Sequence, residues 1–261
     1  MIALDFGIGS LEAELWRVVF LMTRIGAALF AAPFFGANSV PVPVRVSLTG
    51  ALAIFTSIWM PAVQTPPALL SLAGLMAVAG EVLVGLALGF TLQLIFAAPA
   101  IAAELIGGGM GMSMATSADP SSGGTTTAFG QYFAIVLTLI FLATGAHLQW
   151  MALLMESYRA FPPGETWLGA ERFELIASFG GYMFETALRI ALPVVLILFL
   201  VQLVTGVLSR SAPSLNLMAM GLPAGVMAGL VGLIIAAPLI FDQFTTIVGE
   251  GVDMASGVIT R

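Results

Sequence analysis

Few residues of this chain carry groups that could do chemistry, so the first question is whether any of them could converge. Serine hydrolysis needs a serine, a histidine and an acid to meet, and Ser121, His147 and Asp119 supply these residue types. No G-x-S-x-G elbow accompanies Ser121, however. His147 is the only histidine, it lies near Trp150 in "TGAHLQWM", and the chain has no cysteine. We therefore expect a membrane-interface position for His147, no enzyme, no cofactor and no metal site.

The stretch "GGGMGMSMATSADPSSGG", Gly107–Gly124, is the next candidate. It lacks the G-x-G-x-x-G spacing of a dinucleotide loop and the lysine of a P-loop, so phosphate binding is excluded. Met110, Met112 and Met114 stand at every second position. In extended backbone all three share one face, whereas in a helix only the first and third do. A turn between helices with methionines in the core is the simplest interpretation.

Charged residues inside apolar segments are the remaining candidates. Arg17 and Arg24 lie seven residues apart, on nearly the same face of a helix. For Arg17, a side chain reaching the headgroups from a helix end is one interpretation; for the deeper Arg24 we expect a buried partner in another subunit. Glu81 has no obvious local cation, so a proton relay and a hydrogen-bonded packing role both stay open. Glu185 and Arg189 form an i,i+4 pair that predicts structural neutralisation.

Composition defines the environment of these residues. Of 261 residues, 59% are hydrophobic and 8% are charged, against about 25% charged in an ordinary soluble domain. Such a chain needs lipid or other protein as its solvent. Its few, scattered arginines make no nucleic-acid footprint and no polybasic patch. The segment before Arg17 is acidic, unlike a cleavable signal peptide, so we expect Met1 to begin the mature chain.

The elements that would position these residues are apolar segments long enough to cross a bilayer. They predict an all-α, polytopic membrane protein of about six apolar, partly broken helices, folding as a single integral-membrane domain over residues 1–261. Prolines 99, 193, 223 and 238 offer kinks or breaks. Arginines fall on both sides of such a model, so the positive-inside rule gives no clear orientation. The segments are Leu15–Phe35, Val46–Val63, Leu69–Ala103, Ala128–Met155, Phe179–Leu208 and Leu215–Ile240.

Two further features indicate contact with other protein. As a helix, Leu69–Ala103 would reach about 50 Å, beyond a hydrocarbon core of about 30 Å, unless Pro99 turns it back. Part of it would then be covered by protein, as in a subunit of a larger assembly. Small residues at four-residue spacing predict close helix contacts, within the chain or with a partner. These are Gly85 and Gly89, and Gly221, Gly225 and Gly229.

The order of these motifs closely resembles the FliR family, the R subunit of the flagellar protein-export gate, which has counterparts in injectisomes. The resemblance extends from about Arg17 to the last apolar segment. It is carried by "VPVPVRVSL", "GEVLVGLALGFTLQLIFAAPAIAAELIGGGMGMSMATSADPSS", "FLATGAHLQWMALLMES" and "ALPVVLILFLVQLVTGVLSRSAPSLNLMAMGLP", and its most specific pieces are "ALGFTLQ", "MSMATSADPSS", "GAHL" and "LSRSAPSLN".

The resemblance implies a non-enzymatic core subunit of the type III export gate, in the bacterial inner membrane and the flagellar basal body. It implies a hetero-oligomer with the P and Q subunits, FliP and FliQ, and with FlhB, and unfolded flagellar proteins as transient substrates. Lipid is a further partner and nucleic acid is not. The family's helices lie partly above the usual membrane plane, which would explain the overlong third segment. An injectisome subunit, or a small-solute transporter or ion channel, are the alternatives.

For the glycine- and methionine-rich stretch, the resemblance implies a loop that helps to plug the resting channel. Met114 and Ser117 stand where bulky aromatic residues can occur in the family, so the plug here would be softer. Methionine suits that task because its flexible thioether fills irregular gaps. The implied loop residues are Met110, Gly111, Met112, Ser113, Met114, Ala115, Thr116, Ser117, Ala118, Asp119, Pro120, Ser121 and Ser122.

Overall fold

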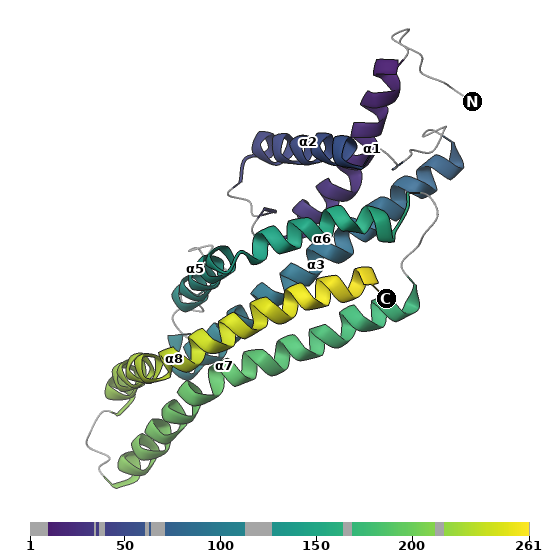
Figure 1. The fold of residues 1–261 in the computed structure, drawn as a ribbon. Coiled ribbons are helices and arrows are strands. Elements are labelled where there is room, and N and C mark those ends of the chain that lie inside the picture. Colours follow the sequence, from purple (N-terminus) through teal and green to yellow (C-terminus); the bar gives the residue numbers. More distant parts are fainter. Residues whose placement is uncertain are drawn as a thin grey trace. The chain divides into compact units, whose positions relative to one another are not determined.

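The computed structural model describes residues 10–33, 35–36, 40–60, 63, 71–112, 127–163, 169–211 and 217–260. Over these residues the regular elements are all α-helices (Figure 1), which confirms the predicted fold class. The helices are α1 (Ser10–Ala31), α2 (Val42–Trp59), α3 (Leu72–Gly109), α5 (Ala128–Ala143), α6 (Ala146–Ala160), α7 (Ala170–Ser211) and α8 (Leu217–Thr260).

Helix α3 is one uninterrupted helix of 38 residues with Pro99 inside it. The prediction that Pro99 could break this segment or turn it back is therefore wrong. A proline removes a single backbone donor, and a helix packed among neighbours tolerates that loss. At this length the helix extends over about 57 Å, which exceeds one straight crossing of a hydrocarbon core of about 30 Å.

The fourth predicted segment is two helices rather than one. Helix α5 ends at Ala143 and α6 begins at Ala146, with Gly145 between them at φ 73°. Glycine adopts this left-handed backbone conformation without strain, whereas other residues do not, which explains why the break between the two helices falls at Gly145. Thr127 caps the start of α5 by accepting a hydrogen bond from the backbone N–H of Gly130 at 3.2 Å.

Helices α7 and α8 are longer than their apolar cores predict. Helix α7 starts at Ala170, nine residues before the predicted start at Phe179, and α8 continues to Thr260, twenty residues beyond the predicted end at Ile240. The extension of α8 is amphipathic: acidic residues are exposed while apolar ones recur at spacings of three and four and are buried. The exposed acids are Asp242, Glu250 and Asp253, and the buried residues include Phe244, Ile247, Val248, Ala255 and Val258. A search for continuous apolar runs misses such a helix.

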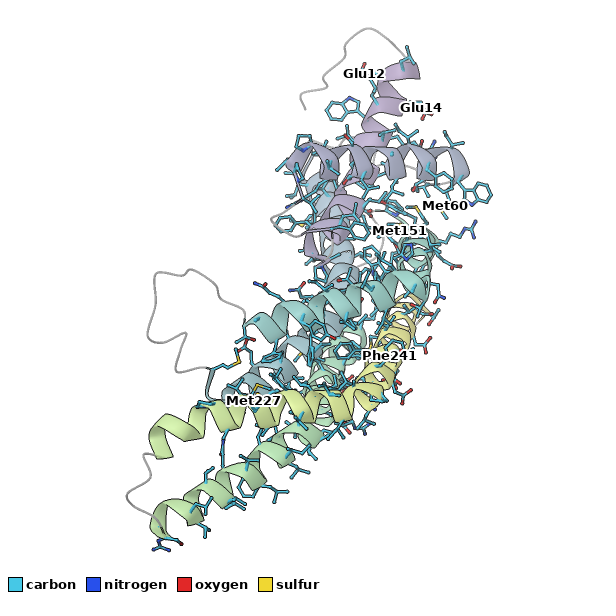
Figure 2. All side chains as sticks on the ribbon, turned by 90° about the vertical axis from the view of Figure 1, so that its left-hand side faces the viewer. Glu12, Glu14, Met60, Met151, Met227 and Phe241 are labelled. Atoms are coloured by element: carbon cyan, nitrogen blue, oxygen red, sulfur yellow. The ribbon has the colours of Figure 1, made fainter. Side chains whose placement is uncertain are left out.

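Four described helices, α2, α3, α7 and α8, are long and apolar enough to cross a membrane, and α5 with α6 would make a fifth if they form one broken span. This is close to the expected count of about six. The side chains along α7 and α8 include many large exposed apolar groups, such as Leu196, Phe199 and Ile234. Met227 and Phe241, labelled in Figure 2, are two further examples on α8. These faces suit lipid or other protein, as the composition predicts.

The chain divides into two compact units. The first contains residues 1–94, 145–180 and 250–261, and its core includes Leu21, Ile25, Ala53, Leu88 and Trp150. The second contains residues 95–144 and 181–249, and its core includes Ile106, Leu137, Ile190, Val194 and Phe244. An edge-to-face contact between Phe133 and Phe244, with ring centroids 5.3 Å apart, joins α5 to α8 in the second unit.

Candidate functional site

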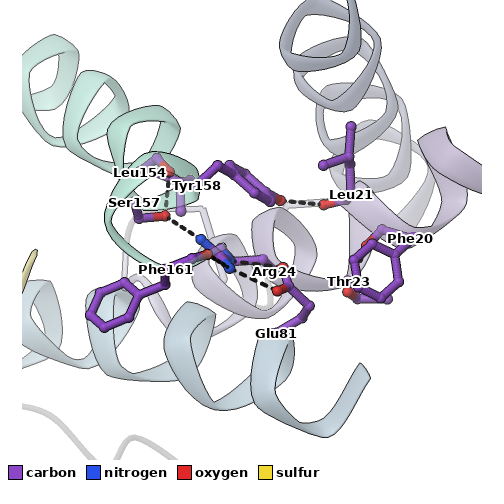
Figure 3. Close-up of polar contacts among 9 residues, drawn as sticks. All are labelled: Phe20, Leu21, Thr23, Arg24, Glu81, Leu154, Ser157, Tyr158 and Phe161. Carbon is purple, nitrogen blue, oxygen red and sulfur yellow. Dashed lines mark hydrogen bonds and ion pairs between the residues drawn. The ribbon is translucent and has the colours of Figure 1, made fainter. Parts of the chain in front are cut away.

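Two buried charges meet where α1, α3 and α6 pack together in the first unit (Figure 3). Arg24 is 1% exposed and Glu81 is 2% exposed. Arg24 donates from Nε to Glu81 Oε2 at 2.8 Å and from Nη2 to Glu81 Oε1 at 2.7 Å. These two parallel hydrogen bonds are the bidentate geometry in which arginine holds a carboxylate most strongly.

The remaining donors of Arg24 reach α6 and the turn that follows it. Nη1 donates to Ser157 Oγ at 3.1 Å, and Nη2 donates to the carbonyl oxygen of Phe161 at 2.8 Å. The guanidinium carbon lies 4.1 Å from the ring centroid of Tyr158, whose hydroxyl donates to the Leu21 carbonyl oxygen at 2.7 Å. We call Arg24, Glu81, Ser157, Tyr158 and Phe161 the Arg24 cluster. It ties three helices together through polar contacts inside an apolar unit.

The geometry of the Arg24 cluster favours a packing role over proton transfer. Both carboxylate oxygens of Glu81 accept from Arg24, and a buried charge is tolerated only when it is paired in this way. The cation that the sequence left unidentified for Glu81 is thus Arg24, 57 residues away. Arg24 makes its hydrogen bonds to partners within its own chain, and these explain its burial. The partner expected in another subunit is therefore not needed.

The glycines that follow Glu81 bring α3 against α1. Glu81, Gly85 and Gly89 lie at four-residue intervals and so share one face of α3. A Cβ on Gly85 would overlap the carbonyl oxygen of Arg24, and a Cβ on Gly89 would overlap that of Ala28. The predicted small-residue face is therefore a contact between helices of one chain, and it continues the face that carries the buried ion pair.

Arg17 lies seven residues before Arg24, on nearly the same face of α1, and its side chain binds the end of α2. Its Nη2 donates to the carbonyl oxygens of Ser57 at 3.2 Å and Met60 at 2.8 Å. Glu14 lies 3.8 Å from its Nη1. The last carbonyl groups of a helix have no partners within the helix and carry partial negative charge. Arg17 therefore caps the C-terminal end of α2.

Glu185 and Arg189 form an ion pair on the surface of α7 in the second unit. Arg189 Nη2 lies 2.6 Å from Glu185 Oε1, and both side chains are 56% exposed. Exposed apolar residues, among them Leu188 and Leu192, surround the pair along the helix. The two charges neutralise each other within a helix that is otherwise apolar.

Two glycines of α8, Gly225 and Gly229, lie against the residue that follows α3. Met110 directly follows α3 and is 1% exposed. A Cβ on Gly229 would overlap its side chain, with Cγ at 2.6 Å and Sδ at 2.8 Å, and a Cβ on Gly225 would lie 3.4 Å from its carbonyl oxygen. Nothing lies within 4 Å of such an atom on Gly221. Two of the three glycines predicted to make helix contacts therefore pack against Met110, the first residue of the implied loop.

Two other helices hold the same end of α3. Gln202 of α7 donates from Nε2 to the Gly109 carbonyl oxygen at 3.0 Å. Glu104 Oε1 accepts from the backbone N–H of Thr127 at 3.3 Å and from its hydroxyl at 3.1 Å. The C-terminal end of α3 is therefore bound to α7 through Gln202, and Glu104 binds the start of α5 through Thr127.

The rest of the implied loop falls largely outside the described residues. Met110 is buried, Gly111 has a φ of 81°, and Met112 is half-buried. Ser113, Met114, Ala115, Thr116, Ser117, Ala118, Asp119, Pro120, Ser121 and Ser122 lie outside the described residues. Asp119 and Ser121, considered above beside His147, are among them.

Several residues that matter in these contacts were not predicted from the sequence. Ser157 and Tyr158 lie just after the fourth predicted segment, which ends at Met155, yet Trp150, Leu154 and Tyr158 recur at the spacing of a buried helix face. Gln202 stands alone in the apolar run "LILFLVQLVTG". A lone polar residue in such a run usually has a functional or hydrogen-bonding partner, and this signal could have identified Gln202.

The four helices long and apolar enough to cross a membrane are those of a polytopic helical membrane protein. The chain belongs to the family described as "Bacterial export proteins, family 1", whose model matches residues 15–251.

Curated relatives match over most of the chain. The chain is 31% identical over 240 residues to the "Flagellar biosynthetic protein FliR" of Escherichia coli (strain K12), covering 92% of this chain and 91% of that protein. It is 30% identical over 238 residues to the protein of the same name from Pectobacterium carotovorum subsp. carotovorum, covering 91% and 90%. The counterpart from Bacillus subtilis (strain 168) is 33% identical over 226 residues, covering 84% and 85%.

Proposed function

We propose that this chain is a non-enzymatic core subunit of the flagellar type III protein-export gate, through which unfolded flagellar proteins leave the cell. The observation that carries the proposal is the match of nearly the whole chain to the export-protein family and to relatives named for flagellar biosynthesis. The names of these relatives favour the flagellar system over an injectisome or a small-solute transporter. The proposed location is the inner membrane, within the flagellar basal body.

The proposed partners are the P and Q subunits, FliP and FliQ, together with FlhB. Support for an assembly comes from the exposed apolar faces of α7 and α8 and from the length of α3. The proposal is tested by purifying the chain after co-expression with the P and Q subunits. We expect a stable hetero-oligomer, and loss of flagellar protein export and motility when the gene is deleted. A stable solitary monomer under these conditions would contradict the proposal, and flux of a small solute through the chain alone would favour a transporter.

We further propose that residues 110–122 help to close the resting channel. Replacing residues 113–122 by a shorter glycine-serine segment should make cells leaky to ions and small solutes, because the closure would lose its bulk. Leak is measured as dye uptake or membrane depolarisation in cells with normal amounts of the complex. Met110 is kept in this variant because it packs against Gly229 and its loss would also disturb folding.

The matched control replaces Met112 and Met114 by leucine, which keeps apolar volume. It should leave the resting gate tight, whereas glycine at both positions should not. Unchanged leak in the shortened variant, with the complex assembled in normal amounts, would exclude the plug role.

A further inference from the structure

We propose that the two compact units are joined by a hinge, which bends in α3, between α5 and α6, in α7 and in α8. The chain passes from one unit to the other at four places, 94–95, 144–145, 180–181 and 249–250. At each of them a proline or a glycine weakens the backbone. The inference does not depend on the export role, because it concerns only how the units of this chain are connected.

The crossing in α3 falls at the carbonyl group that Pro99 deprives of a donor. A proline has no backbone N–H, so the carbonyl oxygen four residues earlier, that of Ile95, loses its hydrogen bond within the helix. Ile95 is also the residue at which the second unit begins. Helix α3 continues through this turn, so the lost bond softens the helix without ending it. Prolines are among the few places where a continuous helix bends sharply.

The other three crossings fall at glycines. Gly145 separates α5 from α6, Gly180 and Gly181 lie inside α7, and Gly249 lies inside α8. We call these four residues the hinge glycines. Glycine weakens a helix more than any residue except proline, because its backbone has the widest range of conformations.

Close packing does not account for the hinge glycines. Among the described residues, nothing lies within 4 Å of a Cβ built on any of them. Gly85 and Gly89 differ in this respect, because the backbone of α1 leaves no room for a Cβ there. Gly145 has a backbone conformation that favours glycine, with φ 73°. The hinge glycines inside α7 and α8 have no such reason, and what they contribute is freedom of the backbone.

Contacts between helices tie the first unit together on its own side of the crossings. Trp150 Nε1 of α6 donates to the Leu88 carbonyl oxygen of α3 at 3.1 Å. Arg172 Nε of α7 donates to the Val258 carbonyl oxygen of α8 at 3.1 Å. The Arg24 cluster adds the bonds from α1 to α3 and α6. All of these residues belong to the first unit.

Different contacts hold the same helices within the second unit. Phe96 of α3 meets Phe141 of α5 edge to face, with ring centroids 5.8 Å apart. A Cβ on Gly232 of α8 would lie 3.3 Å from Val194 Cγ1 of α7. Helices α3, α7 and α8 are thus fixed to neighbours before and after each crossing, and the weakened backbone lies between. Bending therefore concentrates at the crossings, while each unit moves as one body.

The hinge is tested by measuring distances between two spin labels on the detergent-solubilised full chain. The chain has no cysteine, so a pair of introduced cysteines carries the only labels. One pair joins the units, with Leu148→Cys in the first and Ile234→Cys in the second. The within-unit pairs combine Leu148→Cys with Ile58→Cys, and Ile234→Cys with Leu139→Cys. All four positions are exposed in α-helices.

We expect the distance distribution of the pair that joins the units to be at least about twice as wide as those of the within-unit pairs, because it alone includes the hinge. Replacing Gly180, Gly181 and Gly249 together by alanine should narrow that distribution by at least about a third, because alanine restricts a helical backbone far more than glycine does. The within-unit distances should stay unchanged and show that the variant folds. Gly145 is kept because alanine would be strained at its positive φ.

The matched control is Gly50→Ala combined with Gly206→Ala. A Cβ at either position also meets nothing within 4 Å, and both positions lie inside a unit rather than at a crossing. This variant gains helix propensity in the same way, yet it should leave the distribution between the units unchanged.

Three results would overturn the hinge. The first is a distribution between the units that is no wider than those within them. The second is an unchanged width in the triple alanine variant; a lower amount of membrane complex in that variant would then assign the glycines to a contact with another subunit. The third is an equal narrowing by the control variant, which would mean that helix propensity acts on the whole chain and not at the crossings.

Discussion

Replacing Glu81 with alanine should lower the free energy of unfolding by about 3–5 kcal/mol, the largest effect that we expect from any single substitution that removes a polar group from this chain. The variant leaves Arg24 buried and charged, with its Nε unpaired. Ser157 and Phe161 can hold the other guanidinium nitrogens but cannot supply a negative charge. The measurement is thermal or denaturant unfolding of the detergent-solubilised protein, together with the amount of assembled complex in the membrane.

Two controls isolate the cause of this loss. Glu185→Ala breaks an ion pair of similar length whose side chains are half exposed, and it should cost less than about 1 kcal/mol in the isolated chain. Arg24→Leu combined with Glu81→Leu removes both buried charges and should be clearly more stable than Glu81→Ala. Equal losses from Glu81→Ala and Glu185→Ala would show that burial does not govern the contribution of the pair.

Apolar runs predict most of the fold because the physical requirement is simple. A segment that faces lipid or protein must be apolar over its length, and the runs in this sequence mark most of the helices. They miss three features that depend on local detail. Gly145 breaks one run through its left-handed backbone, Pro99 fails to break another, and α8 continues past Ile240 because exposed acids alternate with a buried stripe. The length of an apolar run does not indicate any of these three features.

The sequence indicates which residues belong to the candidate sites, but it does not indicate which of them contact one another. Arg24 and Glu81 attract attention because charges in apolar runs are rare, and Gly85 and Gly89 because small residues recur at helical spacing. Helical periodicity assigns each residue to a face, but it does not identify which helix that face meets. The pairing of Arg24 with Glu81, and of Met110 with Gly229, therefore required the structure. The bond from Gln202 to Gly109 required it for the same reason.

Replacing Gly85 with alanine should destabilise the protein by about 2–3 kcal/mol, although alanine is the better helix former by about 1 kcal/mol. The new methyl group would overlap the backbone carbonyl of Arg24, which cannot move aside as a side chain could. Gly50→Ala is the matched control in α2 of the same unit, since nothing lies within 4 Å of its Cβ. It should stabilise the protein slightly, so the two substitutions should differ in sign when unfolding is measured under the same conditions.

The position of Gly85 makes a stronger version of this test possible. It lies one turn after Glu81 on the face that meets α1, opposite the backbone of the residue whose side chain Glu81 binds. Relieving the overlap requires α1 and α3 to separate, and even a shift of about 1 Å would stretch hydrogen bonds of 2.7 and 2.8 Å beyond useful length. Gly85→Ala should therefore weaken the ion pair as well as the packing. The double variant Gly85→Ala with Glu81→Ala should then lose clearly less stability than the sum of the two single losses, by about 1 kcal/mol or more. Strict additivity in this cycle would mean that the glycine contact and the buried charges hold α1 to α3 independently.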